Sequence, residues 1–118
     1  SGDRRGHLHR GFLDRLGQFL DERYSDAELS VTEIAAAVAM SERQLQRKLK
    51  ALTGQSPGQY LRLFRLKRSL ARLAEGHPVG QVALEVGFAS PAHFSSCFRA
   101  QFGCTPTEYQ KSPQSLEA

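Results

Sequence analysis

The sequence contains no tryptophan, one methionine and only two cysteines among 118 residues. A small secreted domain would carry more cysteines, paired in disulfides, so Cys97 and Cys104 are expected to be free thiols in a reducing cytoplasm. No apolar run approaches the roughly 20 residues that a membrane-spanning helix needs, and no signal peptide is visible. We therefore expect a cytoplasmic location and no membrane partner. Because residue 1 is serine, not methionine, we also expect a fragment of a longer protein.

The patterns that are typical of β-strands are scarce as well. Apolar and polar residues seldom alternate, and runs of Val, Ile and Thr are absent. Leu, Ala, Arg, Gln and Lys dominate instead, and these residues favour helices. The sequence therefore predicts an all-α fold.

The residue sets that catalysis needs are also missing. No pair of carboxylates, nucleophile beside a base or glycine-rich phosphate loop stands in a plausible setting, so we expect neither an enzyme nor a bound cofactor. His93 and Cys97 are four residues apart, with Cys104 close behind, and such a set is able to hold a metal ion. A surface histidine and a buried thiol explain these residues more simply, so no metal site is predicted.

Acidic residues are nearly absent from one stretch of the chain. Residues 41–72 hold nine Lys and Arg against a single acid, Glu42. Residues 1–40 hold five basic and seven acidic residues, and residues 73–118 hold two basic and four acidic residues. The positive charge that gives the chain its net +4 is therefore concentrated in residues 41–72. Such concentration favours a polyanionic partner, with nucleic acid ahead of an anionic membrane surface, over an ordinary solvated helix face.

A small unit occurs twice in the chain. At an offset of 48, residues 31–38 match residues 79–86, through the pairs Val31 and Val79, Ile34 and Val82, Ala35 and Ala83, Val38 and Val86. One extra residue, Ala89, then shifts the offset to 49, and the match continues through Ser41 and Ser90, Leu45 and Phe94, Leu49 and Phe98, Gly54 and Gly103, Pro57 and Pro106. Each copy predicts a short helix, a brief turn and a longer helix, which is a helix-turn-helix outline.

Helix-capping residues mark the ends of these segments. The sequence predicts capping boxes at Ser30–Glu33 and Ser41–Gln44, and an N-cap at Ser90. Prolines are expected at first helical positions and glycines after last turns, namely Pro57, Pro78 and Pro91, and Gly54 and Gly103. Gly87 suits a left-handed residue in the second turn. A first helix is expected over residues 9–23, with Phe12, Leu13, Leu16, Phe19 and Leu20 on one face.

The longer helix of the first copy separates its leucines from its charged residues. At 100° per residue, Leu45, Leu49 and Leu52 share one side, which we expect to pack on the preceding short helix. The opposite side carries no acid and holds Arg43, Gln46, Arg47 and Lys50. Solvated faces usually mix both signs, and Arg and Gln are able to contact base edges in a major groove bidentately. This helix is therefore predicted to contact DNA, with Ser41 at its N-terminus on a phosphate.

The longer helix of the second copy, Pro91 to Phe102, has a similar outline but less charge. We expect it to bury Phe94, Phe98 and Phe102. The positions that match the first charged side are Ala92, Ser95, Ser96 and Arg99, with His93 beside them. Only one of these is a cation, so the second copy is predicted to dock in the same way with weaker electrostatics.

A linker helix is predicted between the copies. From Pro57 to Glu75 it has 19 residues, hence about 28 Å of length, against about 34 Å between successive major-groove openings on one DNA face. Five basic residues surround it, Arg62, Arg65, Lys67, Arg68 and Arg72, and some are expected to contact phosphates. For Arg65 the alternative is a buried ion pair with Glu33 or Glu85.

The second copy carries a specific motif, A-x-x-V-G-F over residues 83–88 followed by H-F-S-x-x-F-R-x-x-F-G-x-T-P-x-x-Y over residues 93–109. Together with residues 30–76, including Arg65-Leu66, it resembles the DNA-binding domain of AraC/XylS-type transcription regulators over about residues 10–111. The resemblance implies a monomeric, homeodomain-like fold of about seven helices, with two helix-turn-helix subdomains joined by one long helix. One departure is Ser96, where the family often has a basic residue.

The resemblance also implies contacts and partners. Base contacts are expected from Arg43, Gln46, Arg47, Ala92, His93, Ser95 and Ser96, and phosphate contacts are expected from Ser41, Lys50, Arg62, Ser90 and Arg99. The expected partners are double-stranded DNA, RNA polymerase and a sensor or effector-binding part outside this chain. The first helix also resembles that of two-component output domains.

The predicted organisation is a disordered tail over residues 1–9, a first subdomain over 10–56, a linker helix over 57–76, a second subdomain over 77–111 and a tail over 112–118. The alternative function is a helix-turn-helix adaptor that binds another protein and does not bind DNA directly. The two readings differ in salt dependence, because binding through several phosphates weakens steeply as salt rises.

Overall fold

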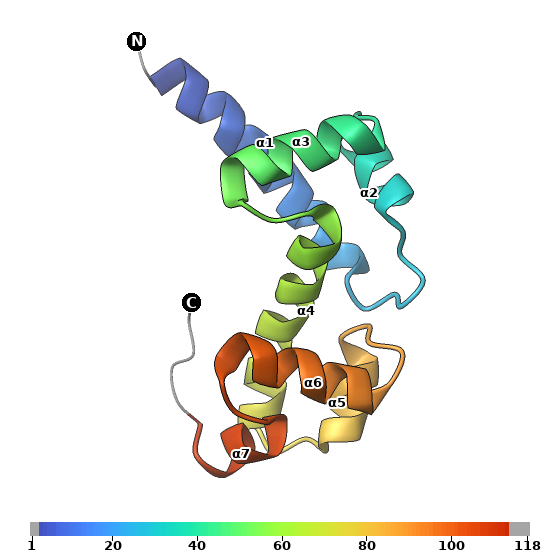
Figure 1. Ribbon diagram of the computed structural model, residues 1–118, viewed down its shortest axis with the longest axis vertical. Helices are drawn as coiled ribbons and strands as arrows, with labels where there is room; N and C mark the ends of the chain where they lie inside the picture. Colours follow the sequence, from blue (N-terminus) through green and yellow to red (C-terminus); the bar gives the residue numbers. More distant parts are fainter. Residues whose placement is uncertain (1–2, 114–118) are drawn as a thin grey trace. The chain divides into compact units, whose positions relative to one another are not determined.

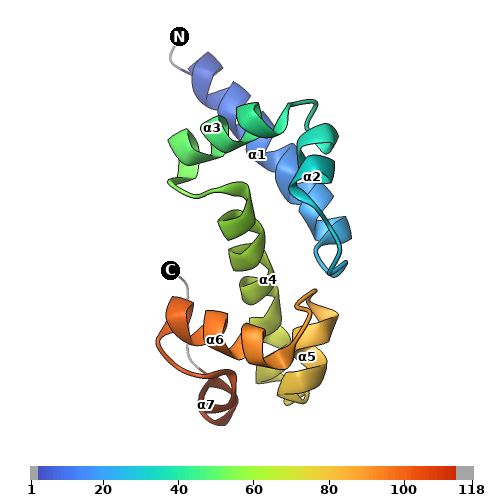
Figure 2. The same ribbon diagram turned by 45° about the vertical axis from the view of Figure 1, so that its right-hand side comes forward.

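The structure is a computed structural model that describes the backbone of residues 3–113 and the side chains of residues 11–113. Within these residues the regular structure is entirely helical, which confirms the all-α prediction. Figure 1 and Figure 2 show the seven helices, which are α1 (Asp3–Arg23), α2 (Val31–Ala37), α3 (Glu42–Thr53), α4 (Pro57–Ala74), α5 (Val79–Glu85), α6 (Pro91–Phe102) and α7 (Pro106–Lys111).

The described chain divides into two compact units. Unit 1 takes the chain up to Arg23 and the segment Leu29–Leu61, and unit 2 takes Tyr24–Glu28 and the chain from Arg62 onward. The boundary therefore falls within α4, which contributes its first turn to unit 1 and the rest to unit 2. The loop that follows α1 belongs to unit 2 although the helices on either side of it belong to unit 1.

Helix α1 begins earlier than the sequence predicts. A tail was expected over residues 1–9 and a helix from residue 9, whereas the helix starts at Asp3. No proline lies between residues 3 and 23, and each residue added to an existing helix gains a backbone hydrogen bond. Residues 1–2 and 114–118, which include most of the predicted C-terminal tail, lie outside the described residues.

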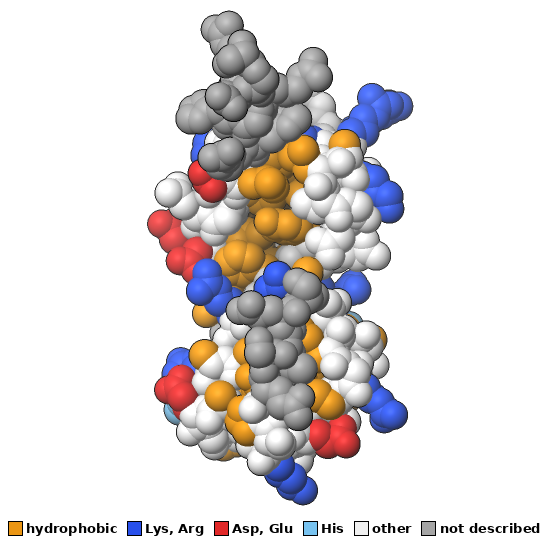
Figure 3. All heavy atoms as spheres, turned by 90° about the vertical axis from the view of Figure 1, so that its left-hand side faces the viewer, with side chains coloured by type: hydrophobic (Ala, Val, Ile, Leu, Met, Phe, Trp, Pro, Cys, Tyr) orange, Lys and Arg blue, Asp and Glu red, His pale blue; other side chains and the backbone are white. Residues whose placement is uncertain are grey.

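Unit 1 is built around the apolar face of α1. Helix α2 packs on both α1 and α3, and the buried side chains come from all three helices. They are Phe12, Leu16, Leu20, Ile34, Ala35, Leu45 and Leu49, and they are joined by Val38 at the end of α2, Leu29 before α2 and Leu61 of α4. The predicted packing of the α3 leucines on the α2 face is therefore confirmed, except that Leu52 is only half-buried. Figure 3 shows a band of hydrophobic side chains that reaches the surface of this unit.

Unit 2 has an aromatic core. Phe94 and Phe98 of α6 are fully buried, and their ring centroids lie 5.7 Å apart. Phe88 lies 5.2 Å from Phe94, and Tyr109 of α7 lies 5.9 Å from Phe98. Phe102, which was expected to be buried, is only half-buried and packs edge-on against Phe98 at 4.7 Å. It occupies the last turn of α6, where one side of the ring faces solvent.

Most of the predicted helix ends are confirmed. The capping boxes Ser30–Glu33 and Ser41–Gln44 are both formed, and Ser90 caps α6 by accepting a hydrogen bond from the His93 N–H. Gly54 and Gly103 end α3 and α6 in the left-handed conformation. One prediction was wrong: Pro78 is the N-cap of α5 and not its first residue, because its ψ of 136° is extended and the helical geometry starts at Val79.

Candidate nucleic-acid interface

The two turns that precede α3 and α6 have the same backbone hydrogen bonds. In the first, the Met40 N–H donates to the Ala35 carbonyl oxygen at 2.9 Å, and in the second the Phe88 N–H donates to the Ala83 carbonyl oxygen at 3.0 Å. In each turn this hydrogen bond joins the first and last of six residues, the fifth of which is in the left-handed conformation. This arrangement is the Schellman motif. The sequence repeat is therefore a structural repeat, and each copy is a helix-turn-helix: α2 with α3, and α5 with α6.

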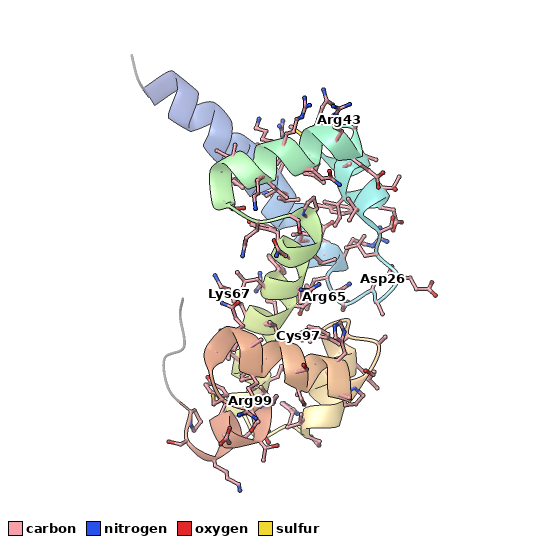
Figure 4. All side chains as sticks on the ribbon, in the orientation of Figure 1. Asp26, Arg43, Arg65, Lys67, Cys97 and Arg99 are labelled. Carbon is pink, nitrogen blue, oxygen red and sulfur yellow. The ribbon has the colours of Figure 1, made fainter. Side chains whose placement is uncertain are left out.

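Helix α3 presents the predicted outward stripe, defined by Arg43, Gln46, Arg47 and Lys50. All four side chains are exposed, and Figure 4 shows Arg43 pointing away from the body of unit 1. The opposite side of the helix is held by Leu45 and Leu49, which are almost completely buried. Because the buried face fixes the rotation of the helix, all four side chains of the stripe are directed to solvent from one side of α3.

The one acid near this stripe is bound to another helix. Glu42 accepts a hydrogen bond from the Thr32 hydroxyl of α2 at 2.8 Å, which ties the start of α3 to the start of α2. At the matching place of the second copy, a β-carbon on Gly80 would lie 3.9 Å from the Pro91 side chain. Glycine and proline have no side-chain group that could form such a hydrogen bond, so this contact is particular to the first copy, where it engages the carboxylate of Glu42 beside the basic stripe.

Two of the predicted phosphate ligands of the first copy already have partners. The Ser41 hydroxyl accepts the Gln44 N–H at 3.1 Å as an N-cap, which leaves its own O–H as a donor. The Lys50 ammonium donates to the Gly54 carbonyl oxygen at 3.2 Å, and therefore lies toward the C-terminal end of α3. Both residues are exposed, so neither contact removes them from solvent.

Helix α6 presents shorter side chains. Ala92, His93, Ser96 and Arg99 are exposed, and Ser95 and Ser90 are half-buried. The His93 ring packs edge-on against the Phe88 ring, with 5.6 Å between the centroids. The predicted base-contacting residues of the second copy are thus mostly exposed on one helix, with His93 held against the preceding turn.

Helix α4 carries basic side chains that differ in surroundings. Arg62, Lys67, Arg68 and Arg72 are exposed, whereas Arg65 is half-buried. The Arg72 guanidinium lies 3.8 Å from the Glu85 carboxylate. Arg68 lies over the Phe64 ring at 4.9 Å. Arg62, the residue of this helix that was predicted to contact phosphate, is thus exposed, and so is Lys67.

Arg65 does not form the ion pair that was considered for it. Glu33 is instead 3.4 Å from Arg23, and Glu85 is the partner of Arg72. Arg65 donates from Nε to the Tyr24 carbonyl oxygen and from Nη2 to the Asp26 carbonyl oxygen, both at 2.8 Å. Burial lowers the pKa of the Arg65 guanidinium, and the Asp26 carboxylate opposes this shift.

The two hydrogen bonds of Arg65 were not predicted from the sequence. The partners are backbone carbonyls, which leave no mark in a side-chain pattern. One indication was present in the repeat: the residue that matches Gly87 is Ala39, so a glycine is not needed at that place for backbone conformation alone.

The described part of the chain offers little for other chemistry. It contains no group of three His, Cys, Asp or Glu side chains that are placed to hold a metal ion. Cys97 and Cys104 are both free and half-buried, and they pack against the core of unit 2. No helix among these residues is long and apolar enough to cross a membrane.

Comparison with known proteins identifies the family. A family model described as a helix-turn-helix domain matches residues 34–112. The HTH-type transcriptional activator RhaS of Escherichia fergusonii is 38% identical over 101 residues, which cover 84% of this chain and 36% of that protein. This chain spans about a third or less of the length of the curated relatives that it matches.

Solved structures agree with this match. An AraC-type transcriptional regulator from Chromobacterium violaceum is 32% identical with a TM-score of 0.77, over 89% of this chain and 96% of that one. The DNA-binding domain of the global transcriptional factor AdpA, crystallised with a target DNA, is 31% identical with a TM-score of 0.72, over 87% and 97%. The chain therefore belongs to the AraC-type helix-turn-helix DNA-binding domains of transcription regulators.

Proposed function

We propose that this domain binds double-stranded DNA sequence-specifically, with α3 and α6 as recognition helices in two successive major grooves. The observation that carries this proposal is the outward stripe of α3, which is exposed, has no acid and is fixed from behind by buried leucines. The relative AdpA was crystallised with a target DNA. Helix α4 has 18 residues, hence about 27 Å of length, against the ~34 Å between successive major-groove openings.

The proposed roles follow from side-chain chemistry. Base contacts in the first groove come from Arg43, Gln46 and Arg47, because guanidinium and amide groups match guanine and adenine edges. In the second groove the base-contacting set is Ala92, His93, Ser95 and Ser96. The phosphate contacts, which fix the register on the duplex, come from Ser41, Lys50, Arg62, Ser90 and Arg99.

The decisive experiment is selection of bound sequences from random duplex DNA, followed by footprinting and titration over a range of salt concentrations. Sequence-specific binding predicts one enriched site with two protected grooves, and an affinity that falls steeply with salt, since each phosphate contact adds about 0.9 to the slope. Absence of enrichment, with affinity for a protein partner that is insensitive to salt, would instead favour the adaptor function.

The role of the complete protein is also a proposal. Because the chain spans about a third or less of its curated relatives, we propose that a sensor or effector-binding part, or the receiver part of a two-component system, lies elsewhere in a cytoplasmic regulator, and that RNA polymerase is its partner. Transcription in vitro from a promoter that carries the selected site tests this. An unchanged transcript level with and without the full-length protein contradicts it.

A further inference from the structure

The loop that follows α1 is held by three side chains of α4. Arg65 binds two of its carbonyl oxygens, those of Tyr24 and Asp26. The Tyr24 ring lies 5.7 Å from the Phe64 ring and 5.8 Å from the Arg68 guanidinium. Figure 4 shows Arg65 directed from α4 toward this loop. All of these residues belong to unit 2, and together they form what we call the Tyr24 clamp: Tyr24, Asp26, Phe64, Arg65 and Arg68.

The turn before α6 lies directly against this clamp. Gly87 is buried and has a φ of 97°. A β-carbon on Gly87 would overlap the Tyr24 carbonyl oxygen and lie 2.7 Å from Arg65 Nε. The residues that follow lead straight into the recognition helix: Phe88 is buried in the aromatic core, and Ser90 caps α6. Arg65 therefore touches, on one side, the loop after α1 and, on the other, the turn that starts α6.

The first helix-turn-helix lacks this arrangement. Ala39, which matches Gly87, has an exposed side chain. The stripe of α3 also has long charged side chains that are able to adjust to a phosphate or a base, whereas the exposed residues of α6 are mostly short. Short side chains reach a base edge only if the helix that carries them is already in place, so the second copy depends more on a fixed backbone.

We propose that Arg65 is a positioning residue for DNA recognition: through the Tyr24 clamp and Gly87 it fixes the turn before α6, and so the placement of α6 in its groove, without contacting DNA itself. The inference rests on the proposed function. Its chemical basis is that a guanidinium donates to two carbonyls from a planar fork, which a lysine does not reproduce. Arg65 thus binds other parts of the protein, whereas the other basic side chains of α4 are exposed.

The test compares Arg65→Lys and Arg65→Gln with Arg62→Ala, a matched basic residue on the same helix that is proposed to contact phosphate. Positioning predicts that both Arg65 variants lose most of the discrimination between the selected and the scrambled half-site under α6, while the discrimination at the half-site under α3 and the salt slope stay unchanged. Arg62→Ala should lower the slope by about 1 at every sequence. If Arg65 instead contacts a phosphate directly, Arg65→Lys should keep nearly the affinity of the unmutated domain for DNA. Arg65→Gln should then lower the salt slope of binding.

A second readout does not need DNA. Amide hydrogen exchange should become faster in residues 24–28 and 86–93 of Arg65→Lys, and remain unchanged in α2 and α3. If that variant fails to fold, Tyr24→Ala replaces it, because it keeps the Tyr24 carbonyl oxygen and removes the packing of the ring on Phe64, Arg68 and the edge of the unit 2 core. Equal losses at both half-sites, or unchanged exchange around residue 87, overturn the inference. If the unmutated domain selects no DNA sequence, the proposed function is wrong, and so is the role of Arg65 in placing α6 on DNA. The hydrogen-exchange data would still show separately whether Arg65 holds the loop and the turn.

Discussion

Ala39 and Gly87 hold equivalent places in the two turns, and both have a positive φ, of 56° and 97°. The hydrogen bonds around them are also equivalent, since the Ala39 N–H donates to the Ala36 carbonyl oxygen and the Gly87 N–H donates to the Leu84 carbonyl oxygen, both at 3.1 Å. A β-carbon on Gly87 would meet the Tyr24 carbonyl oxygen and Arg65, whereas the side chain of Ala39 is exposed. At residue 39 a positive φ alone favours glycine, and alanine is tolerated. At residue 87 glycine is favoured both by its positive φ and by the lack of space for a β-carbon.

Ala39→Gly should stabilise the domain. A left-handed conformation costs an L-residue about 1–2 kcal/mol, and glycine removes this cost while it adds some entropy to the unfolded chain. We expect a net gain of about 0.5–1 kcal/mol in the free energy of unfolding, measured by urea titration. The matched control is Gly87→Ala, which should lose more than Ala39→Gly gains, because its β-carbon meets Tyr24 and Arg65. Similar effects of the two substitutions would contradict the crowding argument.

The features that the sequence predicted well depend on residues that are close together in the chain. Ser41 and Gln44 stand three residues apart, and they exchange hydrogen bonds of 2.9 and 3.1 Å in the structure, because helix geometry alone brings them together. The exposure of Arg43 and Arg47 follows in the same way from a period of 3.6 residues. Local rules therefore gave the helices, most of their caps and the side of α3 that faces solvent.

What the sequence did not predict depends on distant segments. Arg65 is 41 residues from Tyr24, and a carbonyl oxygen is present at every position, so no pattern singles out this partner. Pro78 was placed one position too far into α5, because the choice between cap and first residue depends on how the preceding loop arrives. Which bases and phosphates are contacted stays a prediction, since that depends on the DNA as well as on the protein.

The two thiols should have no regulatory role. Cys97 and Cys104 are free and pack against the unit 2 core, and thiols in such surroundings act as small apolar groups. The double variant Cys97→Ser with Cys104→Ser should bind the selected DNA with the same affinity in the presence and absence of reductant, as measured by fluorescence anisotropy. A redox-dependent affinity of the unmutated protein that disappears in the double variant would show that a thiol does control binding.

The capping box of α7 should make stability depend on pH in the acid range. The Glu108 carboxylate accepts the Thr105 N–H at 2.8 Å, and hydrogen bonds from the Thr105 backbone and then its side chain lower the pKa of Glu108. Because the folded pKa is the lower one, the stabilisation is complete above the ordinary glutamate pKa of about 4.3 and is lost as the pH falls through the folded value.

Glu108→Gln provides the matched comparison for this effect. The amide retains an acceptor oxygen, as Gln44 does in the box of α3, but it does not titrate. The variant should therefore keep the cap and flatten the fall in Tm between neutral and acid pH, as followed by circular dichroism. Parallel Tm curves for the variant and the unmutated protein would mean that other carboxylates cause the acid destabilisation.

Arg47 should determine one base pair of the binding site. It is exposed near the middle of the α3 stripe, where a guanidinium is able to contact a guanine edge bidentately. Arg47→Ala should cost about 1–3 kcal/mol on the preferred site and relax the choice at one position. The measurement is a competition assay over all single-base variants of the selected site. A loss that is uniform over all sequences would identify Arg47 as a phosphate contact instead.

The two half-sites should contribute unequally to binding. The outward stripe of α3 carries Arg43, Arg47 and Lys50, whereas the matching stripe of α6 carries Arg99 as its one cation, among short side chains. Charge-assisted hydrogen bonds are the stronger ones, so α3 should dominate both affinity and sequence choice, while α6 uses weak or water-mediated contacts. Scrambling each half-site in turn and measuring affinity by footprint titration should give a large loss under residues 41–53 and a small one under residues 90–102. Equal losses, or the opposite order, would mean that shape and placement of α6, and not the number of charges, set its share of the binding energy.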